Sequence, residues 1–488
     1  MAEKGLSNMS KKNESQTFID RVVGFSLASW VNCIITVIAT PITTALFSPE
    51  EMGKIALFLS YSNIIIPFIY LGFDQAYCRF YHEPVGNNTK ESLFRLTSHI
   101  ILALTVLASV VVICLWRYFS NRIIGYPTIL IAINLIIYSF GLVFSRLCAM
   151  KCRMDNNVKQ FCIQSIIATI IVKLSFVLVV IISPTAELAI TVRSIFLFLV
   201  FLLFFTIAYN KTKSTIDCKK ETLIKLSKYS LPLFPTVFLV TFNSSLSQIM
   251  LKEYVDFRLL GIYNNGLSIA GLISVIQSGL GSFWTPFVYE YYKKDQTLIQ
   301  KVQSVITVVV IVLALLIMVS QDLIYLILVD KAYWESKAIL ALLLVTPVCN
   351  SLSETLGQGV ELSGKTILKL PAYAINLLVN YLSCIIFIPM LGILGAAIAS
   401  ALASLSMLVT RAAIGERFYK CCSNYFKMIL ALLILVVAGF LNYYLHSFVY
   451  YFLIIALLAV MIMYHKEIKM IISRGSEYLI NLKKRKVK

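Results

Sequence analysis

Charged residues are scarce in this sequence. Asp, Glu, Lys and Arg make up 14% of its 488 residues, whereas soluble domains average about 25%. Hydrophobic residues make up 59%, and the mean hydropathy is +0.83. Such a chain cannot enclose its apolar side chains in a water-soluble core. Its apolar runs reach roughly 20 residues without strand-like alternation, which indicates an all-α integral membrane protein.

Residues that bind metals or form disulfides are few or poorly spaced. The four histidines are scattered, and the eleven cysteines show neither paired extracellular spacing nor a C-x-x-C pattern. We therefore interpret the cysteines as small apolar residues or free thiols, and we expect no metal and no cofactor. The first apolar run lacks a small-residue cleavage site behind it, which favours a retained span over a signal peptide.

The apolar runs predict about fourteen transmembrane helices. Their expected limits are 19–46, 53–80, 92–116, 122–148, 158–182, 185–209, 227–251, 258–289, 301–320, 336–361, 366–390, 392–415, 427–446 and 447–465. The apolar stretch within 321–335 is too short to span and is expected to form a short interfacial helix. The sequence "SPEE" at 48–51 predicts a helix start with a capping box, and "SPTAE" at 183–187 predicts another.

The formal net charge of +19 comes from basic residues in the loops between spans. This distribution reflects membrane topology and does not indicate nucleic-acid binding. If the N-terminus is cytoplasmic, Lys and Arg concentrate on the inside, as the positive-inside rule requires. An even number of spans then returns the basic tail "NLKKRKVK" to the cytoplasm. We expect a multi-pass protein with both termini in the cytoplasm.

A weak internal repeat appears when the sequence is shifted by 208 residues. Gly53 then lies on Gly261, and Tyr81 lies on Tyr289. The shift superposes spans one to six on spans seven to twelve, which predicts a parallel repeat about an axis along the membrane normal. The expected parts are an N-lobe (1–210), a cytoplasmic linker (211–226), a C-lobe (227–417), two additional spans (427–465) and a basic cytoplasmic tail (466–488).

Two motifs connect this 6 + 6 + 2 pattern with a known family. With "SPEEMGKIALFLS" at 48–60 and "LGILGAAIASALASL" at 391–405, the chain resembles the bacterial flippases of polysaccharide repeat units, of the O-antigen and capsule type. These belong to the multidrug/oligosaccharidyl-lipid/polysaccharide exporter superfamily, whose fold is shared by lipid II flippases and drug exporters. Gly395, Ala399 and Ala403 in the second motif are spaced for close helix packing.

The resemblance implies a function and a location. The chain would flip polyprenyl-pyrophosphate-linked oligosaccharides from the inner to the outer leaflet of a bacterial plasma (inner) membrane by alternating access. Its partners would be the lipid-linked oligosaccharide and the lipid bilayer, with a polysaccharide polymerase and glycosyltransferases as candidate protein partners. A coupling ion, H⁺ or Na⁺, stays open.

Two cations interrupt consecutive apolar runs. Lys173 and Arg193 flank the turn at Ser183-Pro184, and at ~1.5 Å per residue both lie roughly 14 Å below it. In a hydrocarbon core ~30 Å thick, this depth is near the middle. A charge there is costly and normally faces a cavity or a partner. The repeat aligns these two positions with Tyr381 and Ala401, which are uncharged.

Two interpretations of these cations stay open. They could receive the pyrophosphate of a lipid carrier, because Arg binds phosphate bidentately and Lys acts as a point charge. Alternatively, they snorkel or form a structural ion pair, with Asp74 or Glu354 as candidate partners. The wider set of candidate substrate-binding residues is Lys173, Arg193, Arg21, Arg79, Asp74, Asn243, Gln248 and Asn264.

The other candidates also have two interpretations. Arg21 and Arg79 are expected near the cytoplasmic ends of spans, where they could clamp a phosphate or simply anchor the helices. Asn243, Gln248 and Asn264 are uncharged polar residues within spans, which could contact sugar hydroxyls or hydrogen-bond between helices.

Two competing functions remain. A cation-coupled drug exporter of the same fold would need a buried carboxylate, and the predicted interior has few acids. A membrane enzyme acting on lipid-linked sugars would need catalytic residues on substantial outside loops. Because the expected outside turns are short, we expect no enzyme activity.

Overall fold

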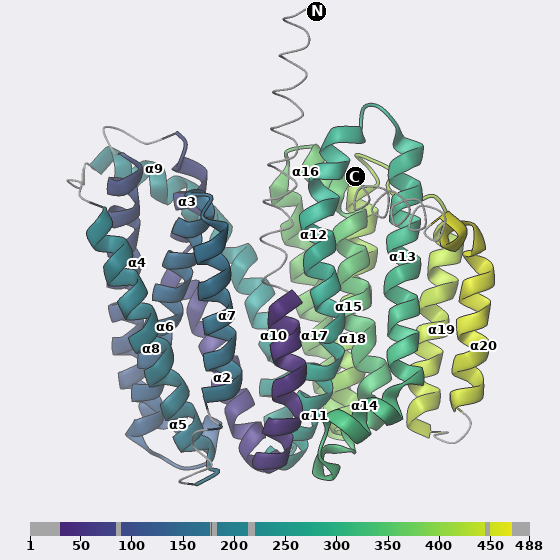
Figure 1. Ribbon diagram of the computed structural model, residues 1–488, viewed down its shortest axis with the longest axis horizontal. Helices are drawn as coiled ribbons and strands as arrows, with labels where there is room; N and C mark the ends of the chain where they lie inside the picture. The colour runs from purple at the N-terminus through teal and green to yellow at the C-terminus, as the bar shows by residue number, and fades with distance from the viewer. Residues whose placement is uncertain are drawn as a thin grey trace, which may run out of the picture. The chain divides into compact units, whose positions relative to one another are not determined.

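The computed structural model describes residues 30–83, 89–175, 177, 183–212, 220–444 and 449–470. The chain divides into two compact units, Met1–Gly261 and Ile262–Lys488, which we call unit 1 and unit 2. The described part of each unit consists of helices, turns and loops (Figure 1). The units reflect packing within the chain, and the division into two six-helix lobes stays a prediction.

Unit 1 is a bundle built around α6. Helices α4, α7 and α8 pack against α6, and α10 packs against α2. Its helices are Trp30–Leu46, α2 (Pro49–Tyr70), α3 (Phe73–Phe80), α4 (Lys90–Cys114), α5 (Trp116–Ile124), α6 (Ile129–Met154), α7 (Val158–Leu174), α8 (Ala186–Lys211), α9 (Lys220–Ser230), η2 (Leu231–Leu233), α10 (Phe234–Tyr254) and the start of α11 (Phe257–Ala270).

Unit 2 is built around α15, whose span is the most buried of the candidate spans. Helices α12, α13, α18 and α19 pack against α15, and α17 and α18 form a tight hairpin. After the end of α11, its elements are α12 (Leu272–Tyr291), α13 (Gln296–Val319), α14 (Gln321–Leu328), η3 (Lys331–Tyr333), α15 (Ser336–Leu356), α16 (Gln358–Leu362), η4 (Thr366–Leu368), α17 (Lys369–Leu391), α18 (Ile393–Gly415), α19 (Tyr425–Tyr444) and α20 (Val449–Met463).

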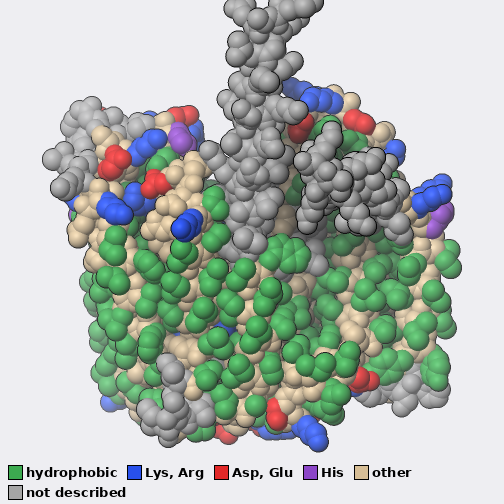
Figure 2. All heavy atoms as spheres, viewed as in Figure 1, with side chains coloured by type: hydrophobic (Ala, Val, Ile, Leu, Met, Phe, Trp, Pro, Cys, Tyr) green, Lys and Arg blue, Asp and Glu red, His purple; other side chains and the backbone are tan. Residues whose placement is uncertain are grey.

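The helices have the surface of a membrane protein. Within the described residues, ten helices are long and apolar enough to cross a membrane, and Trp30–Leu46 and Val449–Met463 are shorter apolar helices. On the face shown in Figure 2, apolar side chains cover a broad middle band, and most charged side chains lie above and below it. Each of the fourteen predicted spans contains at least one described helix. The predicted all-α membrane architecture is therefore confirmed, and so is the short helix predicted within 321–335, which is α14.

Three predicted spans differ from expectation because each breaks at a glycine. The span predicted at 53–80 ends as α2 and resumes as α3 after Leu71 and Gly72, both of which have positive φ. A Cβ at Gly72 would lie 2.5 Å from the carbonyl oxygen of Ser230, so the chain passes too close for a side chain. The other two breaks lie at Gly271, between α11 and α12, and at Gly357, between α15 and α16.

The two predicted helix starts have different outcomes. Ser48 caps α2 as predicted, because its hydroxyl accepts a hydrogen bond from the Glu51 N–H at 3.4 Å. At the second start the N-cap is Thr185 instead of Ser183, and the Thr185 side chain makes no capping hydrogen bond. The Glu51 carboxylate accepts the hydrogen bond from the Ala186 N–H instead. Glu51 thus joins the starts of α2 and α8.

Glycine also sets the closest helix contacts. A Cβ at Gly53 would overlap the carbonyl oxygen of Phe257, and a Cβ at Gly261 would lie 3.0 Å from the nitrogen of Gly53. Gly53 and Gly261 are equivalent in the predicted repeat, and here they are in contact. Gly395 in α18 packs on the backbone of Phe387 in α17, which supports the packing role predicted for the small residues of that helix.

Candidate functional site

The two cations within the predicted spans lie near each other in unit 1. Arg193 is on the face of α8 that packs against α6, and its side chain is 4% exposed. Lys173 lies in the last turn of α7, is half-buried, and is within electrostatic range of Arg193. The buried Tyr138 of α6 is also within electrostatic range of Arg193. The structure therefore places the two positive charges in one region of unit 1, and the Arg193 side chain is buried within the unit.

The acidic candidate Asp74 has a different partner. Asp74 lies in the first turn of α3, is buried, and forms an ion pair with Arg146 of α6 at 2.9 Å. Its carboxylate also accepts a hydrogen bond from Gln75 at 3.2 Å. Arg79, one turn further along α3, pairs with the exposed Glu83 at 2.9 Å. Asp74 is thus a structural counterion of Arg146, and Arg79 forms a surface ion pair.

The remaining candidates are dispersed. Gln248 of α10 accepts a hydrogen bond from Ser60 of α2, and Asn243 lies half-buried on α10 in the same unit. Asn264 is half-buried on α11, in unit 2, and its backbone carbonyl accepts a hydrogen bond from Ser268 at 3.0 Å. Arg21 lies outside the described residues. The structure therefore does not gather these residues around Lys173 and Arg193 within unit 1.

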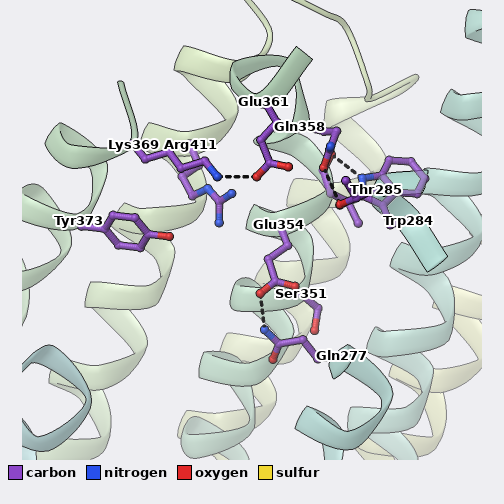
Figure 3. Close-up of a pocket in the computed structure, with 11 residues that line it drawn as sticks. Gln277, Trp284, Thr285, Ser351, Glu354, Gln358, Glu361, Lys369, Tyr373 and Arg411 are labelled. Carbon is purple, nitrogen blue, oxygen red and sulfur yellow. Dashed lines mark hydrogen bonds and ion pairs between the residues drawn. The ribbon is translucent and has the colours of Figure 1, made fainter. Parts of the chain in front are cut away.

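A polar pocket of about 300 Å³ lies in unit 2, beside the break between α15 and α16 (Figure 3). Helices α12, α15, α16, α17 and α18 all contribute side chains to it. We call it the unit 2 pocket, and its lining residues are Gln277, Trp284, Thr285, Ser351, Glu354, Thr355, Gln358, Glu361, Lys369, Tyr373 and Arg411.

Hydrogen bonds and one ion pair fix several of these side chains. The Gln277 amide donates to the Glu354 carboxylate at 3.0 Å, and Lys369 forms an ion pair with Glu361 at 2.5 Å. The Trp284 indole N–H donates to the carbonyl of Thr355 at 3.3 Å. These contacts join α12, α16 and α17 to α15 or to each other, so the pocket wall is held by tertiary contacts.

Arg411 is the unusual residue of the unit 2 pocket. It is 7% exposed, and within the described part of the chain no ion pair or hydrogen bond joins its guanidinium to another side chain. Its guanidinium lies against Gly357, where a Cβ would be 2.7 Å from Nε and 2.8 Å from Nη2. Arg411 and Tyr373 point toward the space beside Glu354 and Glu361 (Figure 3). A buried cation therefore faces a cavity whose opposite wall is acidic.

Three charged residues of these sites were not among the candidates predicted from the sequence, although each lies inside a predicted span. Arg411 lies within the predicted span 392–415, Lys369 within 366–390 and Arg146 within 122–148. Each is a full charge inside a predicted span, but it lies within five residues of the end of that span, where snorkelling also explains it. Among the residues that the structure describes, no group of three or more His, Cys, Asp or Glu side chains could hold a metal ion.

Family comparison identifies the chain. Residues 22–291, more than half of the sequence, match the model of the family described as polysaccharide biosynthesis protein. The chain belongs to this family. No curated protein matches it by sequence.

Solved structures agree on the fold of this family member. A structure of the lipid II flippase MurJ in an inward closed conformation matches with a TM-score of 0.64 at 16% identity, over 91% of this chain and 99% of the other. An inward-facing MATE multidrug transporter of the MOP superfamily matches with a TM-score of 0.57 at 14% identity, over 79% and 94%. The MATE multidrug transporter DinF-BH, in a ligand complex, gives 0.57 at 14% identity, over 83% and 94%. The predicted superfamily is confirmed by family and by fold.

Proposed function

We propose that this protein flips polyprenyl-pyrophosphate-linked oligosaccharides from the inner to the outer leaflet for the synthesis of a surface polysaccharide, such as an O-antigen. The observation that carries the proposal is the pair Lys173 and Arg193, two cations near one another in unit 1 at positions inside predicted spans. Membership of the polysaccharide biosynthesis protein family supports the substrate class.

The physical argument concerns the cost of these charges. A charge in the middle of a bilayer costs a few kcal/mol, and two like charges near one another add to that cost. A pyrophosphate would offset both, because charge-assisted hydrogen bonds to phosphate are strong and Arg binds it bidentately. Lys173 is half-buried and Arg193 is buried. The pyrophosphate would therefore contact Lys173 first, and Arg193 would strengthen the positive potential behind it.

The topology is part of the same proposal. Both termini lie in the cytoplasm of a bacterium, the protein spans the inner membrane, and two six-helix lobes alternate access to the substrate. The distribution of Lys and Arg along the sequence supports this orientation, and the contact between the repeat-related residues Gly53 and Gly261 supports the repeat.

The first test replaces the two cations in a host whose surface polysaccharide depends on this protein. Lys173→Gln together with Arg193→Gln should lower polysaccharide export by about tenfold or more, because each lost charge-assisted contact weakens the bound state. Lipid-linked repeat units should accumulate in the inner leaflet. Export is measured as surface polysaccharide per cell, and the protein level is measured in the same membranes.

Arg117→Gln is the matched control, because Arg117 is an exposed arginine of unit 1 on α5. It should leave export unchanged. Normal export by the double variant at a normal protein level would refute pyrophosphate binding at Lys173 and Arg193.

The alternative of a cation-coupled drug exporter has one observation in its favour. Glu354 of α15 is a carboxylate within a membrane-spanning helix, which such an exporter would need. The two functions predict different phenotypes for a deletion. A flippase deletion accumulates lipid-linked repeat units, whereas an exporter deletion raises drug sensitivity and leaves polysaccharide export intact.

A further inference from the structure

The unit 2 pocket presents two unpaired charges to one cavity. Arg411 of α18 is buried and has no ion pair or hydrogen bond within the described residues. Glu354 of α15 is hydrogen-bonded to the Gln277 amide but has no ion-pair partner within 4 Å among the same residues. The two charges are within electrostatic range of each other. The pocket therefore offers strong donors on one wall and strong acceptors on the other.

We propose that the unit 2 pocket binds a sugar residue of the lipid-linked oligosaccharide. Arg411 and Glu354 would form hydrogen bonds with adjacent polar groups of the sugar ring. This inference rests on the proposed function and assigns the sugar, not the pyrophosphate, to unit 2. A sugar hydroxyl both donates and accepts, so neighbouring hydroxyls satisfy a guanidinium and a carboxylate together. The volume of about 300 Å³ is at the lower end of the range for small-molecule sites.

The remaining lining residues fit the same ligand. Ser351 contributes a hydroxyl group to the pocket wall and Gln277 contributes an amide. The Tyr373 hydroxyl points toward the cavity (Figure 3). Such groups give directional hydrogen bonds without adding charge. A site of this kind rejects an analogue that lacks one hydroxyl, because its buried polar groups are then left unpaired.

The charges disfavour two other ligands. The formal charges of Arg411, Lys369, Glu354 and Glu361 cancel, so the pocket has no net attraction for an ion. A metal cation would be repelled by Arg411, and Glu361 is already paired with Lys369. A phosphate dianion would be repelled by Glu354 and Glu361 across the same cavity. A sugar with little or no net charge satisfies the pocket better than either.

Gly357 is a positioning residue in this proposal. The guanidinium of Arg411 occupies the space where a side chain at residue 357 would begin. A methyl group there would lie too close both to Arg411 and to the carbonyl oxygen of Ser353, at 2.8 Å, so the guanidinium and the local backbone must shift. Gly357→Ala therefore tests the location of the guanidinium, and Arg411→Lys tests its shape with the charge kept.

The experiment uses the full-length chain purified in detergent. The probe is the repeat-unit oligosaccharide of the producing cell, released from its lipid by mild acid, so that it carries no pyrophosphate. Binding is measured by ligand NMR at equilibrium. Arg411→Gln, Glu354→Gln and Gly357→Ala should each weaken binding by about tenfold or more. Arg417→Gln, an exposed arginine just beyond α18, should leave binding unchanged.

Lys173→Gln separates this proposal from the proposed function. It should leave binding of the free oligosaccharide unchanged while lowering export in cells. If wild-type protein does not bind the oligosaccharide, or if the pocket variants bind it normally, the sugar site is refuted and the flippase function stands. If surface polysaccharide is normal in a deletion strain, the flippase function fails whatever the oligosaccharide binds. Thermal unfolding of each variant checks folding, and Tyr373→Phe provides a milder variant if Arg411→Gln does not fold.

Discussion

The two units of this protein are alike in how their helices pack and different in how they hold charge. In both units a glycine lets two backbones meet, Gly53 in unit 1 and Gly359 in unit 2. Unit 1 holds Lys173 and Arg193 at positions where the predicted repeat of unit 2 has Tyr381 and Ala401. Both units therefore use glycine for close packing, at positions that the repeat does not relate, whereas the two charges of unit 1 have uncharged residues at the repeat-related positions of unit 2.

In unit 2, positive and negative charges lie together around one pocket. Arg411, Lys369, Glu354 and Glu361 are two cations and two anions around one pocket, beside the break at Gly357. The balance lowers the cost of placing them in a span, because each cation has an anion within range. Among the described residues of unit 1, the two cations Lys173 and Arg193 lie within electrostatic range of each other, which suits an anionic group. The difference assigns the pyrophosphate to unit 1 and the sugar to unit 2 in our proposals.

The shared glycine packing predicts the largest change in stability. Gly53→Ala and Gly359→Ala should each lower the free energy of unfolding by about 3 kcal/mol. In each case the new Cβ would overlap a backbone carbonyl oxygen, that of Phe257 or that of Gly415, and the helices must separate. Thermal unfolding of the purified protein in detergent, followed by tryptophan fluorescence, measures the effect.

Gly279 is the control for this prediction. It lies in α12, and among the described residues no heavy atom lies within 4 Å of where its Cβ would be. Gly279→Ala should therefore stabilise the protein by up to about 1 kcal/mol, because alanine is the better helix former. Equal effects at Gly53 and Gly279 would show that close packing at Gly53 is not what requires glycine.

The ion pairs of the two units should differ in how much they contribute to stability. Asp74 is 8% exposed and its partner Arg146 is 41% exposed, whereas both partners of the Lys369–Glu361 pair are 23% exposed. Asp74→Asn should lower the free energy of unfolding by about 2 kcal/mol, because the buried side chain loses a charge-assisted hydrogen bond while solvent screens the remaining Arg146. Glu361→Gln should cost about 1 kcal/mol, because solvent screens the remaining lysine.

Double variants test whether these costs come from the pairs. Adding Arg146→Gln to Asp74→Asn should recover part of the lost stability, since the unpaired arginine is removed. Chemical or thermal unfolding of the single and double variants gives the coupling energy. A cost for Glu361→Gln as large as that for Asp74→Asn would contradict the difference in burial between the two pairs.

The sequence was informative about the fold because membrane helices follow from local composition. The length of the apolar runs, the cap at Ser48 and the small residues around Gly395 each depend on neighbours within a few turns. The breaks at Gly72 and Gly357 were not predicted, because hydropathy averaged over a span does not register one glycine. At each break a tertiary contact occupies the space that a side chain would need, with Ser230 in one case and with Arg411 in the other.

The candidate site was predicted less completely for a related reason. A charge in the middle of an apolar run is conspicuous, which is why Lys173 and Arg193 were identified. Arg411 lies near the end of its span, where snorkelling to the interface is the ordinary explanation. The hydrogen bond between Gln277 and Glu354 joins residues 77 positions apart. Only the packing of α12 on α15 brings them together.

A last prediction concerns two thiols of unit 2 outside the spans, whose effect on stability is confined to alkaline pH. Cys421 and Cys422 lie in the segment between α18 and α19 and are buried. Burial, helped by the nearby Glu416 carboxylate, raises the pKa of Cys421 to about 12 and that of Cys422 to about 11. At neutral pH Cys421 should hold roughly 1,000-fold less thiolate than a thiol of pKa 9. Alkylation by N-ethylmaleimide, followed by mass spectrometry, should be slow at both and fast after denaturation in SDS.

The same pKa values give a pH dependence of stability with a definite sign. A thiol whose pKa is raised on folding stays protonated in the folded chain while the unfolded chain begins to lose its proton near pH 9. The stabilisation is complete below that pH and is lost as the pH rises toward the folded pKa, by up to about 1.4 kcal/mol per pH unit for each thiol. The variant Cys421→Ala/Cys422→Ala should show a weaker decline between pH 8.5 and about 10. An equal decline in both proteins would assign the alkaline instability to other groups, such as the buried tyrosines of unit 2.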